Sequence, residues 1–294
     1  MIRTIVRKLF VTGNYFTIVI RKRNSSIFDN MLFSAAHTIP ATREEWCADP
    51  FLAEDNGRSY LFYEKVHGDL GSIEVAELLD DCSVSAPTVL FAGNTHWSYP
   101  NVFQTDGQWY MIPESSAKKE VSLYSAESFP YKWKKERVLL KEAAVDTTVF
   151  FVNGQWYLLT FLPEQGTEKV RPLAFSLRDG NCDPLIWDDY DPLRVRGAGC
   201  PFWYHDALVR PVQVSTEKRY GDAIAFVKME VQGNRYHETE ISIFEVDAVR
   251  AKGQFYDGLH TYNYSEHFEV IDIRCGKLSL IKPIQKITAN LIKR

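Results

Sequence analysis

The feature that most constrains the fold of this chain is an internal repeat in its first half. Segments 49–64, 99–114 and 146–161 each run from a short apolar strand through a tight turn to a returning aromatic strand. The turns end in Gly57, Gly107 and Gly154, each preceded by Asn or Asp, the pairs that hairpins with positive φ require. The glycines recur with a period of roughly 50 residues, which is typical of β-propeller blades.

Two further units complete a ring of five. One runs from Gly199 through 209–213 to 222–226, and the other spans 260–272 and is short of strands. The apolar segment 16–20 is expected to supply a missing strand and to close the ring, so that no sheet edge stays open. The sequence therefore predicts an all-β, five-bladed β-propeller. A β-sandwich is the alternative, but its strands would not repeat with so long a period.

The domain organisation follows from these units. Residues 1–45 hold the N-terminal strand or strands that close the propeller, 46–275 the five blades, and 276–294 a basic helix or tail. In that tail Pro283 suits a first helical position, and Ile284, Ile287 and Leu291 share one face. The face is expected either to dock on the propeller or to let the basic end rest on an anionic membrane.

Composition excludes several classes of protein. The net charge of −4 shows no basic domain of the kind that binds nucleic acid. No segment approaches the roughly 18 apolar residues of a membrane helix, and the N-terminus lacks the pattern of a signal peptide. Scattered cysteines without a CxxC pair indicate neither a zinc site nor a disulfide framework, so we expect a cytoplasmic protein. These cysteines are Cys47, Cys82, Cys182, Cys200 and Cys275.

Acidic residues at equivalent positions of the repeat point to a site on the propeller axis. Asp49, Tyr99 and Asp146 each lie eight positions before their glycine, and His260 takes this position in the fifth unit. Solvated turn capping is the plain explanation for one such acid. It fits less well for several acids among apolar residues, because charges in strand cores are rarely left unpaired. We therefore predict a functional pocket that these residues share.

Other residues are expected to line that pocket. Glu64 and Glu114 each lie seven positions after their glycine, where the third unit has Phe161 and the fourth approximately Gln213. Arg210 is expected either to pair with the acids or to bind an anionic group. Trp46, Trp97 and Trp203 flank the innermost strands, and at least one should be an exposed platform on which a sugar stacks.

Several of these segments carry a family resemblance. The stretches 46–51, 98–100, 112–115, 145–148, 210–213 and 260–263 resemble the N-terminal propeller domain of glucosamine inositolphosphorylceramide transferase. The resemblance runs from about residue 46 to 272 and implies a role in polysaccharide or glycoconjugate synthesis. The glycosyltransferase activity of that family belongs to a separate C-terminal domain, which is not among these segments.

More distantly, the chain is similar to five-bladed glycoside hydrolases such as arabinanases and β-xylosidases. That resemblance implies Asp49 as general base and Asp146 as the residue that orients the acid and tunes its pKa. The family's acid, a glutamate opening the fourth blade, is missing, because 197–201 reads Gly-Ala-Gly-Cys-Pro. Glycoside cleavage needs both an acid and a base. Glu114 or His260 would have to replace the missing acid from another blade, with Glu64 as a further alternative.

Three hypotheses remain open at this point. The protein cleaves or transfers a sugar, or it binds a glycan without catalysis for a polysaccharide assembly pathway, or it is a structural interaction propeller. Fold alone does not choose among them. We expect no cofactor and no resident metal, since neither a nucleotide-binding glycine loop nor metal-ligand spacing is present, although an axial calcium is compatible with the fold. The expected partners are a carbohydrate or glycoconjugate and the enzymes that assemble it.

Overall fold

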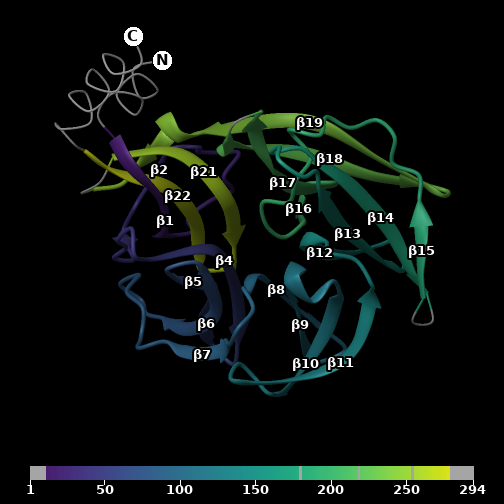
Figure 1. Cartoon of the computed structure of the whole chain (residues 1–294), viewed down its shortest axis with the longest axis horizontal. Helices are drawn as coiled ribbons and strands as arrows, with labels where there is room; N and C mark the ends of the chain where they lie inside the picture. Colours follow the sequence, from purple (N-terminus) through teal and green to yellow (C-terminus); the bar gives the residue numbers. More distant parts are fainter. Residues whose placement is uncertain (1–10, 179–180, 218, 253–254, 279–294) are drawn as a thin grey trace, which may run out of the picture.

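The computed structural model describes residues 11–178, 181–217, 219–252 and 255–278 of the 294-residue chain. Five four-stranded antiparallel sheets stand around one axis as the blades of a propeller (Figure 1). The all-β, five-bladed prediction is therefore confirmed. The predicted C-terminal helix, with Ile284, Ile287 and Leu291, lies outside the described residues. No helix within the described ranges is long and apolar enough to cross a membrane.

The blades follow one another along the chain, each from its innermost to its outermost strand. Blade 1 consists of β4 (Glu45–Asp55), β5 (Arg58–His67), β6 (Leu70–Leu78) and β7 (Thr88–Phe91). Blade 2 consists of β8 (Ser98–Thr105), β9 (Gln108–Glu114), β10 (Val121–Ser128) and β11 (Lys132–Leu140), with the 3-10 turn η1 (Ser116–Lys118) after β9. Blade 3 consists of β12 (Val145–Val152), β13 (Gln155–Pro163), β14 (Val170–Arg178) and β15 (Asn181–Leu185).

The last two blades are less regular. Blade 4 consists of β16 (Phe202–Tyr204), β17 (Ala207–Thr216), β18 (Arg219–Gln232) and β19 (Arg235–Glu245). Blade 5 consists of β21 (Phe255–Tyr264), β22 (Phe268–Leu278), β1 (Val11–Lys22) and β3 (His37–Thr38). A short parallel pair lies outside the blades and joins β2 (Phe33–Ser34) to β20 (Val249–Arg250), with η2 (Val246–Ala248) before β20.

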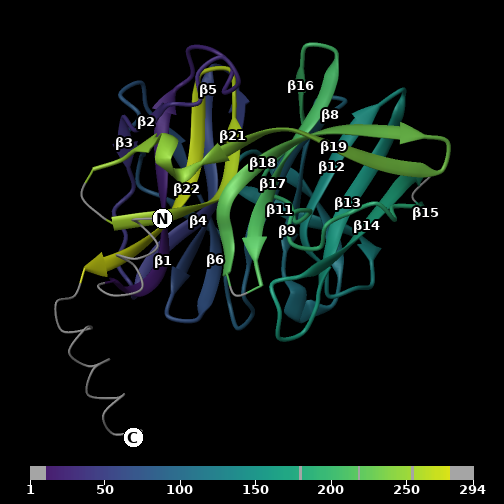
Figure 2. The ribbon, with the colours of Figure 1, turned by 90° about the horizontal axis from the view of Figure 1, so that it is seen from above.

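Blade 5 is built from both ends of the described chain. Phe16 to Ile20 lie in β1 and pair with Arg274 to Val270 of β22. The N-terminal strand is thus the third strand of the last blade, and it runs beside the C-terminal strands in both views of the ribbon (Figures 1 and 2). Segments far apart in the sequence therefore hold the last blade together by main-chain hydrogen bonds.

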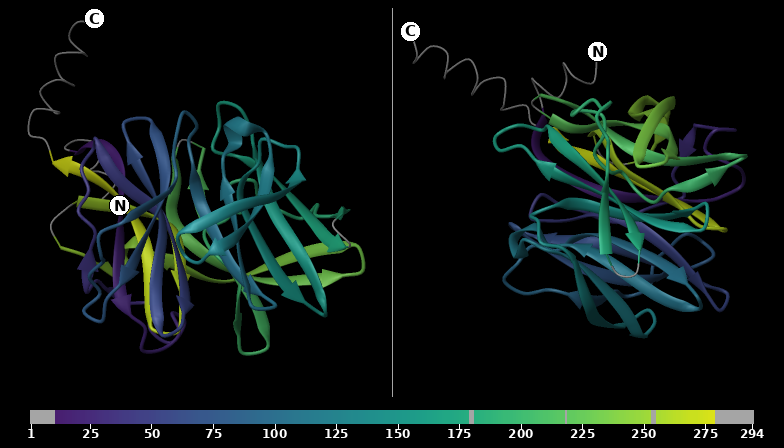
Figure 3. Two further views of the ribbon diagram at one scale, coloured as in Figure 1. Left: turned by 90° about the horizontal axis from the view of Figure 1, so that it is seen from below. Right: turned by 90° about the vertical axis from the view of Figure 1, so that its right-hand side faces the viewer.

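The three glycine turns of the repeat are equivalent in the structure. Gly57, Gly107 and Gly154 have φ of 75°, 74° and 74°, and the residue before each has φ of 50° to 52°. Both central residues of each hairpin turn are therefore left-handed, as the Asn-Gly and Asp-Gly pairs predict. The core lies between neighbouring blades, which bury apolar side chains against one another. Figure 3 shows the ribbon of these blades side by side.

Candidate functional site

One-residue bulges in the innermost strands position several side chains of the site. In β4, β8, β12 and β21 the strand pairing shifts by one residue at Asp49, Tyr99, Asp146 and His260, respectively. Asp49, Tyr99 and Asp146 have φ of 50°, 44° and 50°, a region that non-glycine residues seldom adopt. A bulge of this kind turns a side chain out of the regular alternation. The equivalence that the repeat predicted for these three residues thus extends to their backbone.

In three of these four bulges the amide is satisfied by an acid of the preceding blade. The N–H of Asp49 donates to Asp272 Oδ2 at 2.9 Å, and the N–H of Tyr99 donates to Asp49 Oδ2 at 3.2 Å. The N–H of Asp146 donates to Glu114 Oε2 at 2.9 Å. Buried amides need such partners, so one task of these acids is to hold adjacent blades in register.

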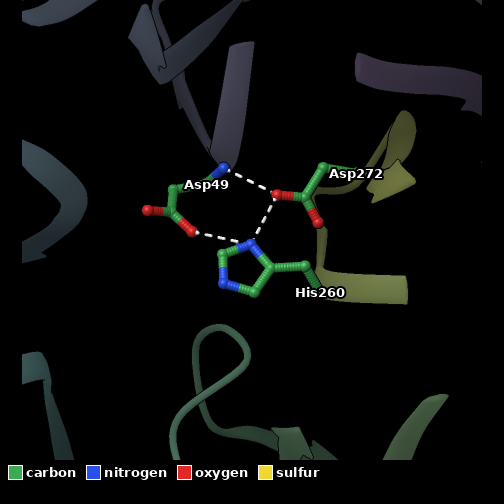
Figure 4. A group of neighbouring side chains, drawn as sticks. All are labelled: Asp49, His260 and Asp272. Carbon is green, nitrogen blue, oxygen red and sulfur yellow. Dashed lines mark hydrogen bonds and ion pairs between the residues drawn. The ribbon is translucent and has the colours of Figure 1, made fainter. Parts of the chain in front are cut away.

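Asp49, His260 and Asp272 form a buried triad within the site (Figure 4). His260 Nδ1 lies 2.9 Å from Asp272 Oδ2 and 3.3 Å from Asp49 Oδ1, and Thr261 Oγ1 donates to Asp49 Oδ1 at 3.1 Å. Burial alone would lower the pKa of His260, but the charges of Asp272 and Asp49 outweigh it and raise this pKa to about 9. His260 is therefore an imidazolium between two carboxyl groups at neutral pH.

Among the described residues, the same triad is one of two groups whose ligand atoms lie close enough together to hold a metal ion; the other is the more exposed group Glu54, Glu266 and His267. One ligand atom each from Asp49, His260 and Asp272 lies within 4.8 Å of the others. The proton on His260 Nδ1 occupies the position that a metal would need, so a cation would have to displace it. The arrangement fits a hydrogen-bonded ion pair better than a metal centre.

A second group reaches closer to solvent. Arg196 forms an ion pair with Asp146, its guanidinium lies 5.4 Å from the centre of the Tyr220 ring, and its side chain is 22% exposed. Burial raises the pKa of Glu114 to about 8, helped by the charge of Asp146 and opposed by that of Arg196. Glu114 thus carries a proton at neutral pH and can both donate and accept hydrogen bonds.

Glu64 and His96 flank this group. His96 Nε2 lies 2.7 Å from the buried Glu64 Oε1, and the hydrogen bond to Glu64 raises the pKa of His96 to about 9. Asp49 has its pKa raised to about 7 by burial, with His260 opposing and with Glu64, Asp272 and Asp146 adding to the rise. The charges of acids on different blades therefore raise one another's pKa. We call the set the axial cluster: Asp49, Glu64, His96, Glu114, Asp146, Arg196, Tyr220, His260 and Asp272.

Some predicted residues lie elsewhere. Arg210 is buried and forms an ion pair with Glu238 within blade 4, so its prediction as a partner of the axial acids is wrong. The ion-pair partner of Asp146 is Arg196 instead. Gln213, by contrast, lies next to the axial cluster. It is fully buried and donates to the carbonyl of Gly197 at 2.7 Å, and Gly197 packs against Tyr99 and Asp146.

The three tryptophans differ in environment. Trp97 is buried, with the ammonium of Lys118 3.9 Å above its ring, which leaves it no free face of the kind expected for a platform. Trp46 is half-buried against Phe16, whose ring centre is 5.0 Å from that of His260. Trp203 alone of the three is exposed, at 54%, and it lies beside Arg23 and Tyr264 in a small hollow rather than among the axial cluster.

The inner edge of blade 4 explains why that blade brings no acid to the axis. The N–H of Gly199 donates to the Tyr99 hydroxyl at 2.9 Å, and the N–H of Cys200 donates to Asn263 Oδ1 at 2.7 Å. Gly199 has φ of 138°, and a Cβ at this position would come within 2.1 Å of the Tyr262 carbonyl oxygen. The backbone of blade 4 therefore packs directly against its neighbours, and there is no room for a longer side chain.

Sequence reasoning missed Arg196, Tyr220, His96 and Asp272. Asp272 could have been predicted from the repeat, because it lies on the second strand of its blade, as Glu64 and Glu114 do. Arg196 lies before the irregular inner edge of blade 4, where the repeat gives no alignment. Nothing in the sequence pattern marks His96 or Tyr220.

Comparison with known proteins places the chain among propellers. Residues 21–278 match the family described as glucosamine inositolphosphorylceramide transferase 1, N-terminal. The glucosamine inositolphosphorylceramide transferase 1 of Arabidopsis thaliana is 29% identical over 271 residues, covering 87% of this chain and 34% of the plant protein. The chain thus spans about a third of the length of that relative.

Two solved structures share the fold at low identity. The β-1,2-mannobiose phosphorylase of Listeria innocua superposes with a TM-score of 0.58 at 12% identity, covering 92% of this chain and 99% of that one. The α-L-arabinofuranosidase of Podospora anserina superposes with a TM-score of 0.57 at 12% identity, covering 79% and 91%. At this level of identity the likeness concerns the arrangement of blades alone.

Proposed function

This chain belongs to the family of the N-terminal domain of glucosamine inositolphosphorylceramide transferase 1, and we propose that it binds a sugar of a glycoconjugate at the axial cluster without cleaving it. The observation that carries the proposal is the group Glu114, Arg196 and Tyr220, which is partly exposed beside the buried acids. We further propose that it serves enzymes that assemble polysaccharides or glycolipids on the cytoplasmic side of a membrane.

The chemistry of this group suits a sugar. A protonated Glu114 donates and accepts hydrogen bonds, and the Arg196 guanidinium offers a planar set of donors to neighbouring hydroxyl oxygens. The Tyr220 ring adds an aromatic surface next to them, 5.3 Å from the His260 ring. Glucosamine in the name of the plant relative supports a sugar ligand for this family.

The buried acids are poorly suited to hydrolysis. Asp49 Oδ2 accepts a hydrogen bond from the N–H of Tyr99, and Asp49 Oδ1 accepts one from the hydroxyl of Thr261. The residue is only 4% exposed. A general base must reach a water molecule on the far side of the sugar from the acid. The fourth-blade acid is absent, and the neighbouring carboxylate of Asp146 is neutralised by Arg196. These features favour binding over cleavage.

A direct binding measurement tests the proposal. We would record saturation-transfer NMR spectra with five ligands. Glucosamine, myo-inositol, mannose and arabinose are suggested by the names of the relatives, and N-acetylglucosamine is added as the uncharged form of the first. At least one should bind the wild type and bind Arg196→Gln at least about tenfold more weakly, since a charge-assisted contact contributes about 1.5–3 kcal/mol. Arg43→Gln, at an exposed arginine, should bind as the wild type does. Binding of none of the five sugars would contradict the proposal.

Catalysis is the second candidate, and the raised pKa of Glu114 favours it. A carboxyl group that is protonated at neutral pH is what a general acid requires. In this mechanism Glu114 or His260 protonates the leaving oxygen while Asp49 activates water or an acceptor hydroxyl.

Aryl glycosides of the sugar that binds separate the two candidates. For an enzyme, Glu114→Gln should slow cleavage of a natural glycan by about 10²–10⁴-fold and that of an aryl glycoside far less, while Asp49→Asn abolishes both. His260→Ala tests the alternative acid in the same way. For a binding protein no aryl glycoside turns over, and Asp49→Asn only weakens binding. Turnover that is unchanged in Asp49→Asn would exclude the catalytic role of that residue.

A further inference from the structure

Two arginines and two aspartates form a closed group next to the axial cluster, where blades 4 and 5 meet. Arg219 and Asp222 belong to β18 of blade 4, whereas Asp257 and Arg274 belong to β21 and β22 of blade 5. We call these four residues the charge square. None of them belongs to the axial cluster, but Tyr220, which does, lies between Arg219 and Asp222 in the chain.

Both carboxylates of the charge square bridge the two arginines. Asp257 accepts from Arg274 Nε at 3.1 Å through Oδ1 and from Arg219 at 3.0 Å through Oδ2. Asp222 accepts from Arg274 at 2.8 Å through Oδ1 and from Arg219 at 2.8 Å through Oδ2. The blade 5 half of the square is buried and the blade 4 half is partly exposed. Buried ion pairs are weak contributors to net stability, and their best-attested role is to fix one geometry.

Two glycines make room for the square. Gly258 lies opposite Arg274 in the strand pairing, and a Cβ at Gly258 would come within 2.7 Å of the Arg274 guanidinium. Gly221 has φ of 67°, and its carbonyl oxygen would lie 2.2 Å from the same Cβ. The backbones of β18 and β21 are therefore in contact, and the side chain of Arg274 takes the space that a larger residue at 258 would fill.

The square fixes the backbone on both sides of Tyr220. Arg219 precedes it directly and Asp222 follows two positions later, so both neighbours are held by ion pairs with blade 5. Arg274 also donates to the carbonyl oxygen of Tyr220. The orientation of this tyrosine is therefore set by residues that do not themselves belong to the axial cluster.

The side chain of Tyr220 reaches into the axial cluster. Its ring centre lies 5.3 Å from that of His260 and 5.4 Å from the guanidinium carbon of Arg196. Its hydroxyl forms no hydrogen bond with any described residue, and it is not one of the fully buried polar atoms that lack a partner, so it is open to solvent. Burial raises the pKa of this hydroxyl, opposed by the charge of Arg196 and helped by acids of blades 1 and 5. The hydroxyl therefore keeps its proton at neutral pH and can donate a hydrogen bond to a ligand.

We propose, on the basis of the sugar-binding function proposed above, that the charge square positions the Tyr220 hydroxyl to form a hydrogen bond with a hydroxyl group of the bound sugar. Arg274 and Asp257 are then positioning residues, which act on the sugar only through Tyr220. A side chain that is already held in place loses less conformational entropy on binding than a mobile one. The square thus increases the affinity of the site as well as directing this contact.

The position of Tyr220 can be tested without any ligand. NMR spectra of the full chain with labelled histidine report on the His260 ring, whose signals depend on the nearby Tyr220 ring. Arg274→Lys and Arg219→Gln should move these signals in the same direction as Tyr220→Leu does. Arg21→Lys is the matched control and should leave them in place, because it changes an ion pair of blade 5 outside the charge square and the axial cluster. Since Arg219 is partly exposed, its variant keeps the test open if Arg274→Lys does not fold. Unchanged His260 signals in the folded square variants would overturn the positioning role.

Sugar affinity tests the contact itself. Tyr220→Phe should weaken binding of the tightest-binding of the five sugars named above by about two- to tenfold, the effect of one lost hydrogen bond between uncharged groups. Arg219→Gln should weaken binding by a comparable factor in the wild-type background and should have no further effect in the Tyr220→Phe background, because it acts through this hydroxyl. Equal losses in both backgrounds, or unchanged affinity in Tyr220→Phe, would overturn the proposal. If none of the sugars binds the wild type, the sugar contact is refuted together with the proposed function, while the His260 signals still decide whether the square positions Tyr220.

Discussion

Replacing Asp272 by Asn should strongly destabilise the propeller, although the two side chains have nearly the same shape. Asp272 is fully buried and accepts from three donors: the N–H of Asp49 at 2.9 Å, the N–H of Thr261 at 2.6 Å, and His260 Nδ1 at 2.9 Å. The amide of Asp272→Asn would keep only one acceptor oxygen, and its NH₂ group would face one of these three donors. The substitution also removes the negative charge that stabilises the imidazolium of His260.

The size of the effect follows from these contacts. A buried N–H without a partner costs about 1–3 kcal/mol, and breaking a buried ion pair costs about 3–5 kcal/mol. The two losses overlap at His260, so we expect Asp272→Asn to lower the free energy of unfolding by about 3–5 kcal/mol at pH 6. This is a large part of the total, since domains are stable by about 5–15 kcal/mol.

The dependence on pH gives a second, independent signature. The pKa of His260 rises from its ordinary 6.5 to about 9 on folding, so its contribution to stability is complete below pH 6.5 and is lost as the pH rises through 9. Asp272 is the largest favourable cause of that rise. The difference in stability between wild type and Asp272→Asn should therefore narrow by about 1–3 kcal/mol between pH 6 and pH 9.5.

Urea unfolding followed by tryptophan fluorescence measures both effects. The midpoint should fall while the slope stays the same, which shows that stability rather than compactness has changed. Asp80→Asn is the control, because Asp80 pairs with Lys22 at 3.1 Å at the surface and should leave the midpoint unchanged. A midpoint for Asp272→Asn equal to that of wild type, or a pH-independent difference, would refute this account of the axial ion pair.

Three other substitutions test different parts of the structure. Gly199→Ala should lower the free energy of unfolding in urea by more than about 3 kcal/mol, because the new Cβ would overlap the Tyr262 carbonyl oxygen and because alanine rarely adopts this backbone conformation. A loss below about 1 kcal/mol would show that blade 4 can move away from Tyr262. Glu238→Gln should cost about 3–5 kcal/mol, since it leaves Arg210 buried without its ion pair, and a change under about 1 kcal/mol would contradict this. Gly107→Ala should lower the thermal midpoint through a loss of only about 1 kcal/mol, because φ is 74° but the space around it is open; a loss as large as that of Gly199→Ala would mean that the turn makes contacts we have not identified.

The repeat was sufficient to predict the fold and the position of several axial residues. A period of roughly 50 residues with glycine turns identifies blades directly. Asp49, Tyr99 and Asp146 take equivalent places because the same bulge recurs at the same distance from each turn. Local pattern and global fold agree at these positions, so sequence reasoning succeeds there.

The contacts between side chains of different blades could not be predicted from the repeat. Whether Arg196 or Arg210 reaches Asp146 depends on which arginine precedes the irregular inner edge of blade 4, and the repeat is weakest there. The exposure of Trp97 and Trp203 likewise depends on neighbours such as Lys118 and Arg23, which come from other turns. Such contacts follow from the three-dimensional arrangement rather than from alternation along one strand.

The position of β1 within blade 5 has a consequence for synthesis on the ribosome. β1 ends at Lys22, and its first pairing residue on β22 is Phe268, so 246 residues must be added before the partner strand exists. At translation rates of about 5–20 residues per second, this interval lasts on the order of 10–50 s. During that time Ile18 and Ile20, which are fully buried in the finished ring, wait on a strand that has only the two-residue β3 beside it and whose edge towards β22 is open. Nascent chains are therefore most prone to association through this strand, and a chaperone that covers early apolar segments would protect them until the last blade is made.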